Sequence, residues 1–418
     1  MNDEILKKYN EAKVVYQKYG VDVDKALEVF NTIPVSLQCW AGDDIKGFED
    51  VGNIHSENVV TGNYPSYAKN GPQLREDIEK AFEFSPLKHK VALHSIYAEH
   101  HHDRNKLTAE DFRERIDWAK EKGYGLDFNT TFFAHPMMDD GNSATSLNDR
   151  IRDYWVECGR GSRAISVEIG RELGQKCYNN FWFPDGSKDT PVNKKLYRNL
   201  LKESLDKMFT PSYTEDESKF ACDCVEGKIF GISTEAFVAG SHYFYLGYAA
   251  THNCGLTLDM GHFNVGEDVS DIISGARPFV KDMMLHVSRG IHWDSDHVVI
   301  ENEALNNMML ELKRGNYYGD VGIGLDYFDA SINRVYGWVI GLRATAKAIL
   351  NSLLDPTDLL NNAELEGNKS LRLFVNEEKN NLPFNDVWNY LLEKKNIKSG
   401  LNIAKELDEY EKNVQMKR

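Results

Sequence analysis

Acidic and histidine side chains stand at or near the ends of four short apolar segments in the stretch from Leu256 to Asp326. The segments read Leu256-Thr-Leu-Asp259-Met-Gly-His262, Met283-Met-Leu-His286, Trp293-Asp294-Ser-Asp296-His297 and Val321-Gly-Ile-Gly-Leu-Asp326. Carboxylate oxygens and imidazole nitrogens are ligands of divalent cations. Such side chains converge from separate strands only in a fold that gathers the strand ends at one mouth. The pattern therefore predicts a divalent-metal site.

A first set of ligands includes Glu226, which ends an earlier apolar run. This set comprises Glu226, Asp259, His286 and Asp326. Three carboxylates and one imidazole suit Mn²⁺, Mg²⁺ or Co²⁺ better than Zn²⁺. Four protein ligands make a closed coordination site, which is typical of an ion that fixes the local structure.

A second, more open set comprises His262, Asp294 and Asp296. Three protein ligands leave positions for water or substrate, as a catalytic ion requires. In an extended segment Asp294 and Asp296 point to the same side, where their charges repel unless a cation lies between them. Alone, any of these residues is better explained as a satisfied core histidine or as an aspartate bonded to a nearby turn. Together, the seven residues favour metal.

Other polar residues are candidates for catalysis. His94 ends another apolar run and is a candidate base, because the ordinary histidine pKa lies near neutrality. Asp296, already a candidate ligand, is counted with it. Lys228 lies two residues past Glu226 and would reach a substrate oxygen, although a lone lysine is usually a surface charge. The run His100-His-His102 is better explained as a solvated loop.

Three aromatic residues beside predicted strand ends are candidates for the walls of a sugar pocket. They are Trp40, Phe133 and Trp182. Aromatic faces pack well on the C–H faces of a carbohydrate. Core packing explains any one of them equally well.

Strand-like and helical segments alternate along the chain, which is typical of a parallel sheet built from strand–helix units. The eight predicted strands are 35–40, 90–94, 125–129, 180–183, 222–226, 255–259, 284–287 and 321–326. The predicted helices are 73–84, 109–122, 147–173, 192–208, 234–251, 303–313 and 331–354. The expected fold class is α/β, a (β/α)8 TIM barrel with an N-terminal helix and a helical C-terminal extension.

Two domains are predicted. Residues 1–354 form the catalytic barrel, including a leading helix over residues 1–34. Residues 355–418 are rich in Asn, Lys and Glu and form a helical extension that is expected to pack on a neighbouring subunit.

Composition excludes several classes of function. The net charge of −16 repels polyanions, so nucleic acid is not an expected partner. No apolar run is long enough to cross a bilayer, so no membrane role is expected. The charged N-terminus lacks the features of a signal peptide, and six scattered cysteines do not form a disulfide pattern, which predicts a cytoplasmic protein.

Several long polar motifs follow one another in order along the chain. They are Ser36-Leu-Gln-Cys-Trp40, Thr61-Gly-Asn-Tyr-Pro65, Leu126-Asp-Phe-Asn129, Trp182-Phe-Pro-Asp-Gly186, Leu258-Asp-Met-Gly-His262, Leu285-His-Val-Ser-Arg289, Trp293-Asp-Ser-Asp-His297 and Gly324-Leu-Asp-Tyr-Phe-Asp-Ala-Ser-Ile-Asn333. In these motifs the chain resembles the L-rhamnose isomerase family along almost its whole length. No family motif matches His100-His-His102 or the far C-terminal tail.

The resemblance implies a homotetrameric barrel enzyme that interconverts L-rhamnose and L-rhamnulose in rhamnose catabolism, using Mn²⁺ or a similar ion. It implies that His262, Asp294 and Asp296 bind a catalytic ion, with Mg²⁺, Co²⁺ or Zn²⁺ as alternatives, and that the four-ligand set binds a structural one. By the same resemblance His94 opens the sugar ring, and the pocket residues are Trp40, Phe133, Trp182 and Lys228. Phe132 is adjacent to Phe133, and either is the counterpart.

The mechanistic hypothesis is a metal-assisted hydride shift between C1 and C2 of the ring-opened sugar. It is favoured because the paired sites come with no well-placed second base; the rival route passes through an enediol. Two other classes of function stay open on residues alone: a metal-dependent phosphoesterase or endonuclease, and a non-catalytic sugar- or metal-binding module. The charge of −16 argues against the former.

Overall fold

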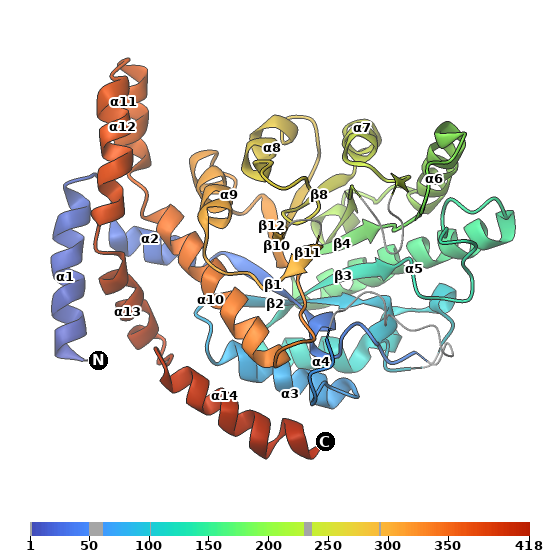
Figure 1. Cartoon of the computed structure of the whole chain (residues 1–418), viewed down its shortest axis with the longest axis horizontal. Coiled ribbons are helices and arrows are strands. Elements are labelled where there is room, and N and C mark those ends of the chain that lie inside the picture. Colours follow the sequence, from blue (N-terminus) through green and yellow to red (C-terminus); the bar gives the residue numbers. More distant parts are fainter. Residues whose placement is uncertain (1, 50–61, 101, 230–235, 292–293) are drawn as a thin grey trace.

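Eight parallel strands close into a barrel with helices on the outside (Figure 1). The computed structural model describes residues 2–49, 62–100, 102–229, 236–291 and 294–418, and for residues 294–296 it describes the backbone only. None of the described helices is long and apolar enough to cross a lipid bilayer. The closed barrel of eight parallel strands confirms the predicted (β/α)8 fold.

The barrel strands follow one another around the barrel in chain order. They are β1 (Pro34–Gln38), β2 (Lys88–His94), β3 (Gly125–Thr131), β4 (Cys177–Trp182), β6 (Ala221–Glu226), β8 (Gly255–Asp259), β9 (Met283–Val287) and β12 (Val321–Leu325). All eight predicted strands are present. The expectation that Trp40 ends the first strand is wrong, because β1 ends at Gln38 and Trp40 lies in the short 3-10 helix η1 (Cys39–Gly42).

A helix follows each barrel strand. These helices are α3 (Gly71–Phe82), α4 (Arg113–Lys122), α5 (Asp149–Leu173), α6 (Lys194–Met208), α7 (His242–His252), α8 (Val269–Ala276), α9 (Glu303–Arg314) and α10 (Arg334–Leu353). Thr108 and Asp111 form a capping box in η5 (Ala109–Phe112), the turn that leads into α4. Helix α8 is not among the helices named from the sequence; Asp268 caps it by accepting a hydrogen bond from the backbone N–H of Ser270.

The helix predicted over 234–251 begins later than expected. Ser241 caps α7, because its side chain accepts a hydrogen bond from the backbone N–H of Phe244. Before that cap, β7 (Phe237–Val238) pairs antiparallel with β5 (Gly186–Ser187). Residues 234 and 235 lie outside the described residues.

The chain ends pack on one side of the barrel. The leading segment forms two helices, α1 (Asp3–Gln17) and α2 (Val23–Phe30), rather than one, with Gly20 at a positive φ of 76° between them. The C-terminal extension is helical as predicted: α11 (Thr357–Leu365), α12 (Lys369–Glu378), α13 (Phe384–Lys394) and α14 (Asn402–Asn413). Tyr390 of α13 stacks on Tyr9 of α1 with ring centroids 3.6 Å apart, while α11 and α12 project away from the barrel (Figure 1).

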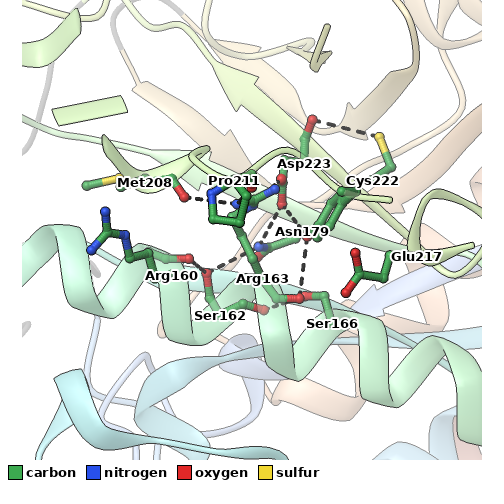
Figure 2. Close-up of polar contacts among 12 residues, drawn as sticks. Arg160, Ser162, Arg163, Ser166, Asn179, Met208, Pro211, Glu217, Cys222 and Asp223 are labelled. Carbon is green, nitrogen blue, oxygen red and sulfur yellow. Dashed lines mark hydrogen bonds and ion pairs between the residues drawn. The ribbon is translucent and has the colours of Figure 1, made fainter. Parts of the chain in front are cut away.

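A buried polar network fixes α5 against the outer face of the barrel (Figure 2). Arg163 Nε of α5 lies 2.7 Å from Asp223 Oδ2 of β6, and Asn179 of β4 donates to Asp223 Oδ1. Arg163 Nη1 also donates to the carbonyl oxygens of Met208 and Pro211. Because alternate residues of a strand point to opposite faces, holding Asp223 on the outside directs Glu226 to the inside.

Candidate metal centre

Four of the predicted ligands meet at the mouth of the barrel. One ligand atom each from Glu226, Asp259, His286 and Asp326 lies within 4.8 Å of the others. Glu226 and Asp259 end β6 and β8, His286 lies in β9, and Asp326 follows β12. Strand pairing sets Asp259 directly beside His286, and the backbone N–H of Asp326 donates to the carbonyl of Val287. The barrel register itself therefore brings together residues that are 100 positions apart in the chain.

The donor atoms in this cluster fit a divalent cation. Glu226 Oε1, Asp259 Oδ2 and His286 Nδ1 are buried and make no hydrogen bond within the described chain. His286 Nδ1 lies 3.2 Å from Asp326 Oδ2, 3.4 Å from Glu226 Oε2 and 3.8 Å from Asp259 Oδ2. Buried polar atoms that lie this close together without hydrogen bonds are costly, so their convergence is best explained by a bound ion. Three carboxylates and one imidazole suit Mn²⁺, Mg²⁺ or Co²⁺.

The charges in the cluster are strongly coupled. Burial raises the pKa of Asp259 to about 7. Burial also opposes the charge of Glu226, but His286 and His262 hold the pKa of that carboxyl well below its usual range. Burial opposes the charge of His286 too, yet the nearby carboxylates of Glu226 and Asp326 raise its pKa well above the ordinary value. Without an ion the cluster therefore retains protons, which a cation would displace.

Each of two ligand carboxylates has one oxygen satisfied by a neighbouring side chain. Ser288 Oγ donates to Asp259 Oδ1 over 2.6 Å, and Asn180 Nδ2 donates to Glu226 Oε2. Ser288 and Asn180 are not among the site residues predicted from the sequence. The available signal was their position. Asn180 lies two residues before Trp182 on the same face of β4, and Ser288 lies two residues after His286, directly after the end of β9.

His262 lies against the four-ligand cluster. Its Nδ1 is 3.0 Å from Glu226 Oε1 and 3.2 Å from the carbonyl oxygen of Gly227, and its Nε2 is 3.7 Å from Asp259 Oδ2. Its expected partners Asp294 and Asp296 belong to β11 (Asp294–His297), which pairs with β10 (Arg289–Ile291) directly after β9. The side chains of Asp294 and Asp296 lie outside the described residues.

Aromatic rings continue the rim from Asp326 to His262. Three pairs of rings meet edge to face. Their ring centroids are 4.4 Å apart for Trp40 and His94, 6.0 Å for His94 and Phe133, and 5.5 Å for Phe133 and Trp182. Trp182 lies 6.3 Å from His262, and the Nζ of Lys228 lies 5.4 Å from the Trp182 ring. The candidate pocket residues therefore form one continuous row of side-chain contacts. The rings of Trp40, His94, Phe133 and Trp182 in this row are called the aromatic wall below.

Phe133 rather than Phe132 belongs to this wall. The Phe132 ring stacks on Phe183 at 3.9 Å and also contacts Phe181 and Trp155 in the core. Adjacent residues point in different directions here, so only Phe133 borders His94.

His94 differs from the sequence expectation in its ionisation. Burial, assisted by the charge of Arg104, lowers its pKa to about 3, so the expectation of an ordinary pKa near neutrality is wrong. Its Nδ1 lies 2.9 Å from the hydroxyl of Thr131. His94 is thus a neutral imidazole held in one orientation.

Two residues of the histidine run face solvent. The side chains of His100 and His102 are 53% and 63% exposed, while residue 101 lies outside the described residues. Neither belongs to the four-ligand cluster.

Comparison with known proteins identifies the family. The L-rhamnose isomerase family model matches residues 3–418. The chain belongs to the L-rhamnose isomerase family. An L-rhamnose isomerase of Listeria innocua is 45% identical over 418 residues, covering 99% of both chains. L-rhamnose isomerases of Lactiplantibacillus plantarum and Rhodopirellula baltica are 45% and 42% identical and cover 100% and 98% of this chain and 97% and 96% of their own.

Membership of the L-rhamnose isomerase family confirms the enzyme class predicted from sequence, an intramolecular oxidoreductase acting as a sugar isomerase. Among solved structures, a D-tagatose 3-epimerase-like protein aligns with 72% of this chain and 98% of its own at 14% identity, with a TM-score of 0.47. The barrel assignment given above depends on the strand pairing of this chain alone.

Proposed function

We propose that this chain interconverts L-rhamnose and L-rhamnulose with the help of divalent cations bound at the barrel mouth. One observation carries the proposal: three buried donor atoms without hydrogen bonds, from Glu226, Asp259 and His286, converge beside an aromatic wall in a chain of this family. A site that needed only to be stable would not gather such atoms without hydrogen bonds.

The proposed ligands form two groups. Glu226, Asp259, His286 and Asp326 hold one cation, and His262, Asp294 and Asp296 hold a second that faces substrate. The donor types suit Mn²⁺, Mg²⁺ or Co²⁺ better than Zn²⁺. Of these ions we propose Mn²⁺, with the other three as alternatives. When bound, the cations polarise the two adjacent sugar oxygens and stabilise developing negative charge.

The proposed sugar pocket is lined by Trp40, Phe133 and Trp182. Their rings provide apolar surfaces for the C–H faces and the methyl group of the sugar. Lys228 lies beside Trp182 and supplies a positive charge that donates hydrogen bonds to a substrate oxygen. Asp296 is proposed to act both as a ligand and in catalysis.

His94 is proposed to assist ring opening. Its Nδ1 is engaged by Thr131, which leaves Nε2 for the sugar. A neutral imidazole accepts the proton of the anomeric hydroxyl and returns it to the ring oxygen as the bond between C1 and the ring oxygen breaks. In the open sugar, the hydrogen on C2 then moves to C1 with its electron pair, while the O2 proton passes to O1.

The first experiment is an assay of ketose formation from L-rhamnose by the metal-free protein and by the protein with added Mn²⁺. The expected result is activity only with the cation. Glu226→Gln is the test variant, because it alters a proposed ligand. Its control is Glu172→Gln, which removes a carboxylate on α5 that pairs with Arg113 far from the mouth. Full ketose formation without a cation would overturn the proposal.

A second experiment separates hydride transfer from the enediol route. In heavy water, a hydride shift leaves the transferred hydrogen in the sugar, whereas an enediol exchanges it with solvent. Extensive deuterium at C1 of the ketose would contradict the hydride shift and leave the isomerase assignment intact.

The expected assembly is a homotetramer, and residues 1–354 and 355–418 are proposed as barrel domain and extension. The exposed apolar side chains of the projecting α11–α12 pair, Leu365, Leu373 and Phe374, support contact between the extension and a neighbouring subunit. Light scattering of Phe374→Asp should show fewer subunits per particle than the parent.

A cytoplasmic location is proposed as well, supported by six cysteines that are all free.

A further inference from the structure

The carboxylates of Asp259 and Glu226 share one arrangement. Each has one oxygen bound by a neighbouring side chain and one buried oxygen without a hydrogen bond that faces the cluster. A carboxylate that can rotate offers either oxygen to a cation, whereas a carboxylate held by one oxygen offers only the other. The neighbours that hold these oxygens therefore decide which donor atoms a cation meets.

Ser288 holds Asp259 within a closed set of hydrogen bonds. The backbone N–H of Gly261 donates both to Ser288 Oγ and to Asp259 Oδ1 at 2.7 Å, and the Ser288 hydroxyl donates to the same Oδ1 at 2.6 Å. Because the Gly261 N–H only donates and an ionised carboxylate only accepts, the single hydrogen of the hydroxyl points to the carboxylate. Ser288 is 2% exposed, so water does not replace this bond.

Thr257 and Asn180 hold Glu226 through a relay. Asn180 presents one end of its amide to Glu226 Oε2 and the other to Thr257 Oγ1, 2.7 Å away. A carboxylate only accepts hydrogen bonds, so the NH₂ end of Asn180 must face Glu226. The amide oxygen then faces Thr257, whose hydroxyl must donate. By donating to the amide oxygen, Thr257 satisfies it and stabilises the amide in the orientation that Glu226 requires.

We propose that Ser288 and Thr257 are positioning residues of the cation centre, Ser288 acting on Asp259 directly and Thr257 acting on Glu226 through Asn180. This inference rests on the proposed function, since it requires that the cluster bind a cation. The second neighbours of metal ligands fix ligand orientation, and their loss typically weakens metal affinity about 10- to 100-fold.

The test is the dissociation constant of Mn²⁺ without substrate, measured by electron paramagnetic resonance of free Mn²⁺, for Ser288→Ala and Thr257→Val. Thr257→Val keeps the shape of the side chain and removes only the hydroxyl. Two matched controls alter buried hydroxyls that make no hydrogen bond within the described chain: Ser36→Ala in β1 and Thr130→Val in β3.

The expected result is Mn²⁺ affinity weakened about 10- to 100-fold in both test variants and changed less than about twofold in both controls. Ser288→Thr, which keeps a hydroxyl, should recover part of the loss. A purely structural role would lower the melting temperature of the metal-free variants and leave their Mn²⁺ affinity unchanged, and that outcome would overturn the inference. If the parent protein bound no Mn²⁺, the cation centre itself would be wrong, which distinguishes the two failures.

Discussion

The indole Nε1 of Trp40 donates a hydrogen bond to Oδ1 of Asp326 across 3.2 Å. This bond links the aromatic wall to the acidic cluster, because the Trp40 ring also packs edge to face on His94. A sugar seated against Trp40 would therefore contact a residue that also orients a candidate metal ligand. Binding of the substrate and binding of the cation are expected to depend on each other.

Trp40→Phe tests this link, since it keeps an aromatic ring and removes only the donor. We expect Mn²⁺ affinity to fall about 10-fold, as for other groups that orient a ligand. The measurement is a Mn²⁺ titration of the metal-free protein. Trp118→Phe is the matched control, because Trp118 Nε1 donates to Glu79 on the outside of the barrel at 2.7 Å. Equal effects of the two variants would contradict the proposed link.

Phe133 and Phe132 should respond in opposite ways to truncation. Phe132→Ala removes a ring that stacks in the core and should lower the free energy of unfolding by about 3–5 kcal/mol. Phe133→Ala should instead raise KM for L-rhamnose with a smaller loss of stability, because Phe133 borders His94 and Trp182 at the mouth. Urea unfolding and steady-state kinetics of both variants measure the difference. An increase in KM confined to Phe132→Ala would reverse the assignment.

Cation binding should stabilise the fold. A ligand that binds only the folded state at 100 times its dissociation constant adds about 2.7 kcal/mol to the free energy of unfolding. We expect chelator to lower the melting temperature and Mn²⁺ to restore it. Glu226→Gln should lose most of the response to Mn²⁺, whereas Glu172→Gln should keep it. An unchanged melting temperature of the parent protein upon chelation and Mn²⁺ addition would argue against a bound ion.

His262→Ala and Asp294→Asn test the substrate-facing ion. Loss of a ligand of a catalytic ion removes several kcal/mol of transition-state stabilisation, so turnover should fall at least about 100-fold. The four-ligand site should remain, and metal analysis should therefore find one ion per chain fewer than in the parent. A His262→Ala protein with most of its activity would show that the open site is assigned wrongly.

Acid should destabilise the protein through His135. Burial, together with the charge of Arg104, lowers the pKa of this residue to about 4. Its Nδ1 accepts a hydrogen bond from the backbone N–H of Met137, so protonation there would break that bond. Between pH 6.5 and 4 the unfolded chain binds a proton on this histidine that the folded chain does not, so stability falls as pH falls.

The expected loss is about 1 kcal/mol per pH unit over that range. His135→Gln removes the titrating group, so its free energy of unfolding should decline less steeply with acid than that of the parent. Denaturant unfolding at several pH values measures both slopes. Parallel slopes for the two proteins would mean that His135 does not contribute.

The barrel could be predicted because its strands combine apolar runs with polar ends. Asp259, His286 and Asp326 each close or lie within such a run, and parallel pairing then brings them together without further information. Two neighbouring residues show the limit of this reasoning. Phe132 and Phe133 are identical in type, and only the turn of the chain after β3 decides which one enters the core.

The proposed roles of residues that act through another residue could not be assigned from the sequence alone. Ser288 and Thr257 are ordinary hydroxyl residues in apolar surroundings, and only the positions of Asp259 and Asn180 give their hydroxyls a direction. The ionisation of His94 was also beyond reach, because its low pKa results from burial under residues distant in the chain. The end of the first strand was predicted two residues too late, because β1 ends at Gln38 and Trp40 lies in η1.

The most direct test of a cation centre at this mouth is an anomalous difference map from crystals grown with Mn²⁺. A peak is predicted within about 2.5 Å of Glu226 Oε1, Asp259 Oδ2 and His286 Nδ1, the three buried atoms without hydrogen bonds. A map with no peak among these atoms, or with Mn²⁺ only elsewhere on the protein, would contradict the account.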